Sequence, residues 1–181
     1  YRMNANVRRL VMSAFFAALA LVVFVVEAQF PPLFIPGAKL GLSNIFSLFA
    51  LVLYGPGEAL AVVLVRTLLG SLITGSVGSL VYSLTAGLIA VAAEALLVKF
   101  VFPRISIVAV SVTCAVLHNI VQCALFVAVN GAPQMLAYMP YLALIGVPSG
   151  ALVGLAVYLL IRHLPARLLF GAAQGGISEK D

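Results

Sequence analysis

The chain has 181 residues, of which 64% are hydrophobic and 8% are charged, and its formal net charge is +5. Its mean hydropathy is +1.22, and it contains five acidic residues and no Trp. So little polar surface cannot cover a water-soluble globule, which excludes the soluble fold classes. The composition predicts an all-α integral membrane protein in contact with the lipid bilayer.

Six apolar stretches are candidates for transmembrane helices. A helix needs about 20 apolar residues to cross the hydrocarbon core of a bilayer. Clusters of Pro and Gly separate the stretches and are strong turn signals. In chain order the stretches lie near residues 10–30, 40–54, 58–74, 78–100, 105–130 and 137–163. The first also has features of a signal peptide, but its length and the five stretches that follow favour a helix. We therefore expect one domain of six helices.

The lysines and arginines predict the orientation. If the amino terminus is cytoplasmic, only Lys39 falls in an outer loop, and the inner side is rich in cations as the positive-inside rule requires. The inner residues are then Arg2, Arg8, Arg9, Lys99, Arg104, Arg162, Arg167 and Lys180. We expect a multi-pass protein of the cell membrane with both termini in the cytoplasm. Because these charges set topology, we expect no nucleic-acid partner.

Motifs for catalysis and for cofactor binding are missing from the sequence. There is no Gly-rich phosphate loop and no Gly-x-Ser-x-Gly, and Asp181 is the only aspartate. Cys114 and Cys123 lie nine residues apart on one helix, too far for a disulfide. Cys114 with His118 supplies only two metal ligands. We expect no enzymatic activity, no cofactor and no metal site.

Arg66 stands in the middle of an apolar run, at the depth of the membrane interior. A guanidinium stays charged and is costly in hydrocarbon, so it must face a protein interior, an acidic partner or an anionic ligand. Two interpretations remain open from the sequence. Arg66 forms a structural pair with Glu94 on the next helix, or it contacts a ligand.

Other polar side chains gather in the outer half of the predicted bundle, which indicates a cavity open to the outside. Each has an alternative role, because His118 and Gln122 can bridge helices and Tyr141 can belong to an interfacial aromatic belt. Glu27 and Glu58 are interpreted as membrane-edge residues. The candidate ligand-binding residues are Lys39, Asn44, Arg66, Tyr82, His118, Asn119, Gln122 and Tyr141.

Two stripes of small residues at i, i+4 spacing allow close approach of helix backbones. Gly146, Gly150 and Gly154 form the stripe on the last helix, where internal packing is the favoured interpretation. Ala14 and Ala18 form the stripe on the first helix, where a docking surface for a partner is the alternative.

The predicted six helices and the Ala14-x-x-x-Ala18 stripe resemble the substrate-binding S component of energy-coupling factor (ECF) transporters. Within that superfamily three blocks resemble the Gx transporter family, often labelled heptaprenyl diphosphate synthase component I. The blocks are Pro36 to Asn44, Gly55-Pro56-Gly57-Glu58, and Arg66-Thr67-Leu68-Leu69-Gly70. The resemblance spans all six predicted helices, and the blocks around the second and third carry most of it.

The resemblance implies that the chain captures a small vitamin-like organic molecule from outside. It also implies docking through Ala14 and Ala18 on a membrane-embedded T subunit, with two ATPase subunits driving the importer. Lys39, Arg66 and His118 suggest a substrate with an anionic or electron-rich group. The synthase label does not fit the residues, because prenyl-chain synthesis needs acidic clusters that hold magnesium diphosphate.

Two other functions remain as alternatives. An autonomous secondary carrier would use Arg66, Glu94 and His118 as a proton-coupled relay. A membrane subunit of a redox or biosynthetic complex would have no transport role.

Overall fold

The computed structural model describes residues 5–30, 41–102 and 104–163 of the chain, with α-helices and short 3₁₀ turns throughout. Lys39 lies outside the described residues. The helices are α1 (Ala5–Gln29), α2 (Asn44–Tyr54), α3 (Pro56–Ile73), α4 (Leu80–Phe100), α5 (Ile107–Asn130) and α6 (Met139–His163). Two 3₁₀ turns, η1 (Val77–Ser79) and η2 (Pro133–Tyr138), precede α4 and α6. The all-α prediction is confirmed.

Five of the helices are long and apolar enough to cross a membrane. The exception is α2, which has 11 residues and begins at Asn44 rather than near residue 40. At about 1.5 Å per residue this helix is roughly 16 Å long, about half the thickness of a bilayer core. The described part of α2 is therefore too short to cross the membrane alone.

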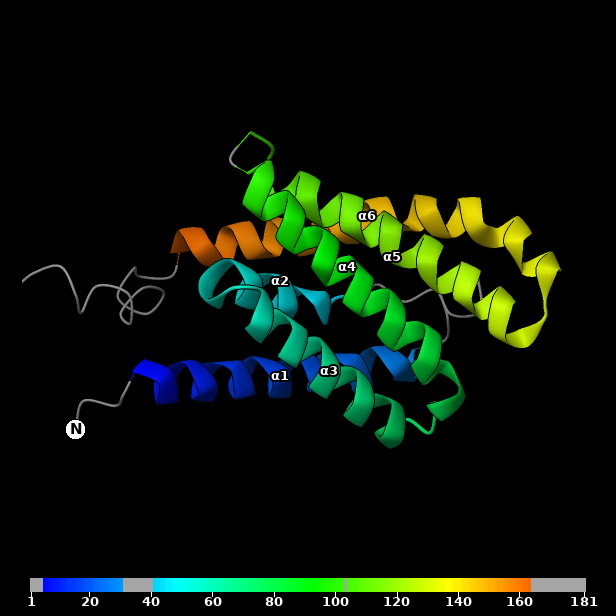
Figure 1. Ribbon diagram of the computed structural model, residues 1–181, viewed down its shortest axis with the longest axis horizontal. Helices are drawn as coiled ribbons and strands as arrows, with labels where there is room; N and C mark the ends of the chain where they lie inside the picture. Colours follow the sequence, from blue (N-terminus) through cyan, green and yellow to red (C-terminus); the bar gives the residue numbers. More distant parts are fainter. Residues whose placement is uncertain (1–4, 31–40, 103, 164–181) are drawn as a thin grey trace, which may run out of the picture.

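The helices α5 and α6 run antiparallel and form the most closely packed pair (Figure 1). A Cβ atom added at Gly150 would lie 2.6 Å from Cα of Val112, and one at Gly154 would lie 2.6 Å from Cα of Val108. No side chain fits at such distances, so these glycines let the two backbones touch. Internal packing is thus the role of the predicted glycine stripe on α6.

The short helix α2 lies inside the bundle, between α1 and α3 on one side and α6 on the other (Figure 1). Its middle residues are completely enclosed, with Leu48 and Ala50 at 0% exposure. Phe49 packs edge-on against Phe16 of α1, with ring centroids 5.3 Å apart. This apolar core fills the half of the bundle next to the α2–α3 turn and leaves the other half for polar side chains.

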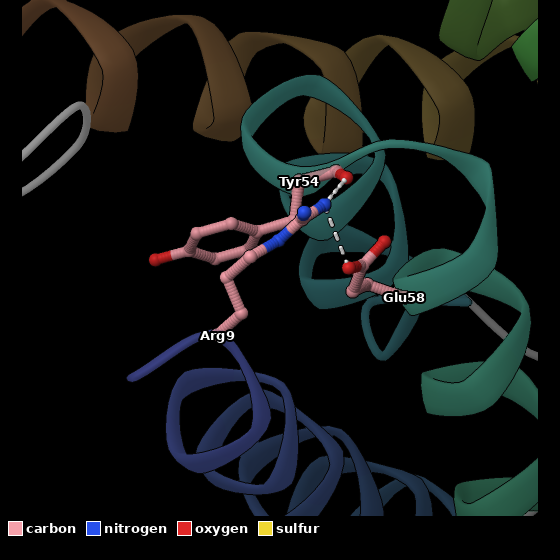
Figure 2. A network of polar contacts seen from close by, with 3 residues as sticks. All are labelled: Arg9, Tyr54 and Glu58. Carbon is pink, nitrogen blue, oxygen red and sulfur yellow. Dashed lines mark hydrogen bonds and ion pairs between the residues drawn. The ribbon is translucent and has the colours of Figure 1, made fainter. Parts of the chain in front are cut away.

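The turn between α2 and α3 is fixed by backbone conformation and by one charged side chain of α1. Gly55 has a φ of 101°, a conformation that a side chain would strain, and Pro56 begins α3. Arg9 Nη2 donates to the Tyr54 carbonyl oxygen at 2.6 Å and lies 2.8 Å from Glu58 Oε1 (Figure 2). The block Gly55 to Glu58 thus ties the start of α1 to the turn.

Apart from the buried Arg66, the described lysines and arginines gather at one end of the bundle. The start of α1, the α2–α3 turn, the α4–α5 connection and the end of α6 all lie there (Figure 1). These segments carry Arg8, Arg9, Lys99, Arg104 and Arg162. Within the described ranges, the connections at the opposite end contain no Lys or Arg. The bundle therefore has the charge asymmetry that the sequence predicts.

Candidate functional site

The Arg66 side chain is buried inside the bundle, with 4% of its surface exposed. Nη1 donates a hydrogen bond to Ser43 Oγ at 2.7 Å, and Nη2 donates to Oδ1 of Asn44. Nε is also buried but has no hydrogen-bond partner. A buried donor without a partner is costly. Arg66 is therefore held by two neutral side chains, and its Nε–H is left for a further acceptor.

The turn that presents Ser43 and Asn44 is itself held by a carboxylate of α1. Glu27 accepts hydrogen bonds from the backbone N–H of Leu42 at 2.9 Å and of Ser43 at 3.4 Å. These N–H groups lie just before α2, where helix donors have no partner within the helix. Glu27 is also close enough to Arg66 for electrostatic attraction. The charges of α1 and α3 thus meet at the start of α2.

A polar cavity surrounds Arg66, with an empty volume of about 600 Å³ that includes its open part. All six helices contribute to its wall. The residues that matter for recognition are Glu27, Ser43, Asn44, Arg66, His118 and Gln122. His118 lies beside the side chain of Gln122 and the backbone of Ala86. A cavity with so many donors and acceptors inside an apolar bundle can bind a polar molecule or water.

Glu94 of α4 lines a second cavity together with Ser111 and Cys114 of α5. Asn44 and His118 line both cavities, so the two are adjacent. The exposed fraction of Glu94 is 6%. Within the part of the chain that the structure describes, its carboxylate has no hydrogen-bond or ion-pair partner. Arg66 is near enough to attract Glu94 electrostatically, but the two form no direct salt bridge.

Five of the predicted ligand-binding residues meet at the polar cavity: Asn44, Arg66, His118, Asn119 and Gln122. Asn119 is partly committed to the fold, because its Nδ2 donates to the Leu142 carbonyl oxygen at 2.8 Å.

The other two described candidates lie elsewhere. Tyr82 lines a neighbouring, more apolar cavity that Asn119 and Gln122 share, and its ring packs edge-on against Phe126 with centroids 5.4 Å apart. Tyr141 has 62% of its surface exposed and lines neither cavity. The structure does not bring Tyr141 to the site.

Sequence reasoning missed Glu27 and Ser43. Glu27 was interpreted as a membrane-edge residue, although its carboxylate reaches the backbone of residues 42 and 43. Ser43 adjoins Asn44 in the block Pro36 to Asn44 and could have been chosen on that ground. The position of Glu27 gives no such signal, because its partners are main-chain groups that only the fold brings near.

The structure also locates the two cysteines and the alanine stripe of α1. Cys114 and Cys123 are both buried and both free. Within the described ranges no group of three or more His, Cys, Asp or Glu side chains is arranged to hold a metal ion. Ala14 and Ala18 both lie on the exposed surface of α1, whereas Ala17 and Ala20 face the core. The alanine stripe is therefore available for contact outside this chain.

The comparison with known families gives one result. No curated protein and no solved structure was found to match the chain. A family model described as heptaprenyl diphosphate synthase component I matches residues 16–160, which include most of α1, all of α2 to α5 and nearly all of α6. The matched range contains every described residue of the polar cavity. The chain therefore belongs to the heptaprenyl diphosphate synthase component I family.

Proposed function

We propose that the chain is the substrate-binding S component of an ECF-type importer in the cell membrane. The observation that carries the proposal is the polar cavity around Arg66, built from all six helices of an otherwise apolar bundle. Its wall of hydrogen-bond donors and acceptors suits a small polar molecule. The family name is that of a synthase component, but the chain supplies no acidic cluster for such chemistry.

In the proposed topology the chain crosses the membrane six times, with both termini in the cytoplasm. Apart from Arg66, the described lysines and arginines lie at one bundle end, which supports this orientation because the positive-inside rule assigns that end to the cytoplasm. The cavity then lies in the outer half, where Glu27 near the end of α1 and Asn44 at the start of α2 are found.

The proposed partners are a membrane-embedded T subunit and two ATPase subunits. The exposed positions of Ala14 and Ala18 support docking at α1, since small residues allow a partner helix to approach closely. ATP hydrolysis in the partners then drives release of the bound molecule on the cytoplasmic side. The chain itself acts by binding and reorientation, and we propose that it is not an enzyme.

An autonomous proton-coupled carrier is the second candidate. It is favoured by the buried carboxylate of Glu94, which lines the same cavity as His118. Intramembrane carboxylates and imidazoles are the usual members of proton relays. In this function the two residues exchange a proton during transport, and no ATPase partner is needed.

The deciding experiment is purification from native membranes, followed by mass spectrometry of the proteins and small molecules that copurify. The importer predicts a T subunit and two ATPases, and uptake in reconstituted liposomes that requires ATP and survives collapse of the proton gradient. Accumulation by the lone protein under a pH gradient would establish the carrier instead. Ala14→Leu separates the two further, because only the importer depends on the surface of α1.

A further inference from the structure

Two buried ionisable side chains of the site, one basic and one acidic, lack full partners. Arg66 retains a free N–H at Nε, and Glu94 retains a carboxylate with no partner among the described residues. Both side chains are more than nine-tenths buried. Each lines one of two adjacent cavities, which share Asn44 and His118 as common wall residues. A molecule that spans both cavities would meet a donor at one end and an acceptor at the other.

The charges that line the two cavities do not balance. Among the described residues that line them, Arg66 is the one cation if His118 is neutral, whereas Glu27 and Glu94 are both acidic. The Glu27 carboxylate is satisfied by the backbone of Leu42 and Ser43. When Glu94 is ionised, the excess negative charge therefore rests on it. An ionised carboxylate in such a place is unfavourable without a cation or hydrogen-bond donors.

We propose that the bound molecule is bifunctional, with a protonated amine at Glu94 and an anionic or carbonyl group at Arg66 Nε. This inference rests on the proposed binding function and names the class of its substrate. A purely anionic molecule would satisfy Arg66 but would leave Glu94 unpaired beside it. A compound with both groups removes the two unfavourable burials together, and matching both ends sets its length.

The test uses the full-length protein in nanodiscs and a series of defined probes. The series is the ω-amino acids from glycine to 6-aminohexanoate, each compared with an equimolar mixture of the matching carboxylic acid and primary amine. Ligand binding to the folded state raises the unfolding temperature, and the rise increases with affinity and with ligand concentration. We expect at least one chain length to raise the unfolding temperature above the value for its matched mixture, with a dissociation constant measurable by calorimetry.

Variants assign the two ends. Glu94→Gln should weaken binding of the best amino acid by about tenfold or more, because a charge-assisted hydrogen bond is lost. It should not weaken the response to the acid, because the like charge beside the acid is removed. Glu94→Asp keeps the charge and should keep the preference for the amine. This variant keeps the test decisive if Glu94→Gln fails to fold. Glu58→Gln is the matched control, since Glu58 pairs with Arg9 at the other bundle end. It should bind like the wild type.

Two results would overturn the proposal. One is a series in which no amino acid exceeds its matched mixture on the wild-type protein. The other is a preference for the amine that appears only in Lys39→Gln, which would show that a cation of the chain itself neutralises Glu94. Both results are independent of the copurification experiment. The transport function can therefore hold while this substrate class fails, and this substrate class can hold while the transport function fails.

Discussion

Arg66 Nη1 lies 2.7 Å from Ser43 Oγ, so the middle of α3 is joined directly to the turn that begins α2. Glu27 of α1 holds the same turn from the other side through the backbone N–H groups of Leu42 and Ser43. Three helices thus meet through one short segment. The charges that line the cavity also position its wall, which means that binding and local structure are coupled.

The first prediction concerns Arg66→Gln. The variant removes the buried cation, so a ligand acceptor at this place would be desolvated without its partner. We expect a loss of about 2 to 5 kcal/mol in the free energy of binding. The measurement is calorimetric titration of the purified protein with the small molecule that copurifies with the wild type. Ser43→Ala removes one hydrogen bond that the Arg66 guanidinium donates but keeps the cation, so it should weaken ligand binding less than Arg66→Gln does.

A double substitution separates a direct contact from charge balance. If Arg66 acts only by neutralising Glu94, then Arg66→Gln with Glu94→Gln should recover both expression and binding. Because the two side chains form no salt bridge, we expect recovery of expression with binding still lost. Full recovery of affinity in the double variant would remove Arg66 from the binding site.

The second prediction concerns Glu27→Gln. One oxygen is replaced by an amide that cannot accept, and the remaining hydrogen bond loses its charge. We expect the apparent free energy of unfolding to fall by about 1 to 3 kcal/mol. Glu58→Gln breaks a more exposed ion pair and should cost about 0 to 1 kcal/mol. Thermal unfolding of both variants in the same detergent measures the difference, and equal losses would contradict the structural role of Glu27.

Asn44 and Glu27 differ in whether their place in the site could be predicted from the sequence. Asn44 could be predicted because it is polar and stands at the start of an apolar run. Such a side chain is expected to face the bundle interior rather than lipid. Five helix positions follow from the same reasoning about apolar length and Gly or Pro boundaries. Glu27 sits near a helix end, where a solvated carboxylate is equally reasonable. The partners of Glu27 are the backbone N–H groups of Leu42 and Ser43, which only the folded structure brings near it.

The structure contradicts two predictions from the sequence, the place of Tyr141 in the site and the length of α2. Tyr141 has the depth expected of a site residue, but helix rotation decides its direction, and α6 turns its glycine stripe toward α5 and leaves this ring exposed. The length of α2 was overestimated because Leu40 to Ser43 continues the apolar pattern. Gly41, with a φ of 67°, lies in the turn before Asn44. Rotation and turn geometry depend on packing that hydropathy does not encode.

The third prediction concerns Gly70, which closes the block that begins at Arg66. A Cβ atom at Gly70 would lie 2.4 Å from the ring of Phe24, which lines the cavity. Gly70→Ala should therefore displace the ring and lower the apparent free energy of unfolding by about 1 to 3 kcal/mol. Gly57→Ala is the matched control, because no atom lies within 4 Å of its added Cβ.

Binding should respond to Gly70→Ala as well, since Phe24 also forms part of the cavity wall. A second change, Phe24→Leu, gives the added methyl group room and should recover part of the lost stability. The measurement is thermal unfolding of the single and double variants. An unchanged melting temperature in Gly70→Ala would show that α1 and α3 are further apart than the structure has them.

The last prediction concerns the exposed alanines of α1. Ala14→Leu or Ala18→Leu adds bulk at a surface that a partner helix is proposed to approach closely. Both positions are exposed and neither lines the cavity around Arg66, so folding and ligand binding of the isolated protein should remain unchanged. Uptake by cells that contain the complete importer should be lost, together with copurification of the T subunit. Val81→Leu on α4, where the side chain is 60% exposed, is the control for added bulk toward lipid and should transport normally. Normal uptake by both alanine variants would exclude this face of α1 as the docking surface.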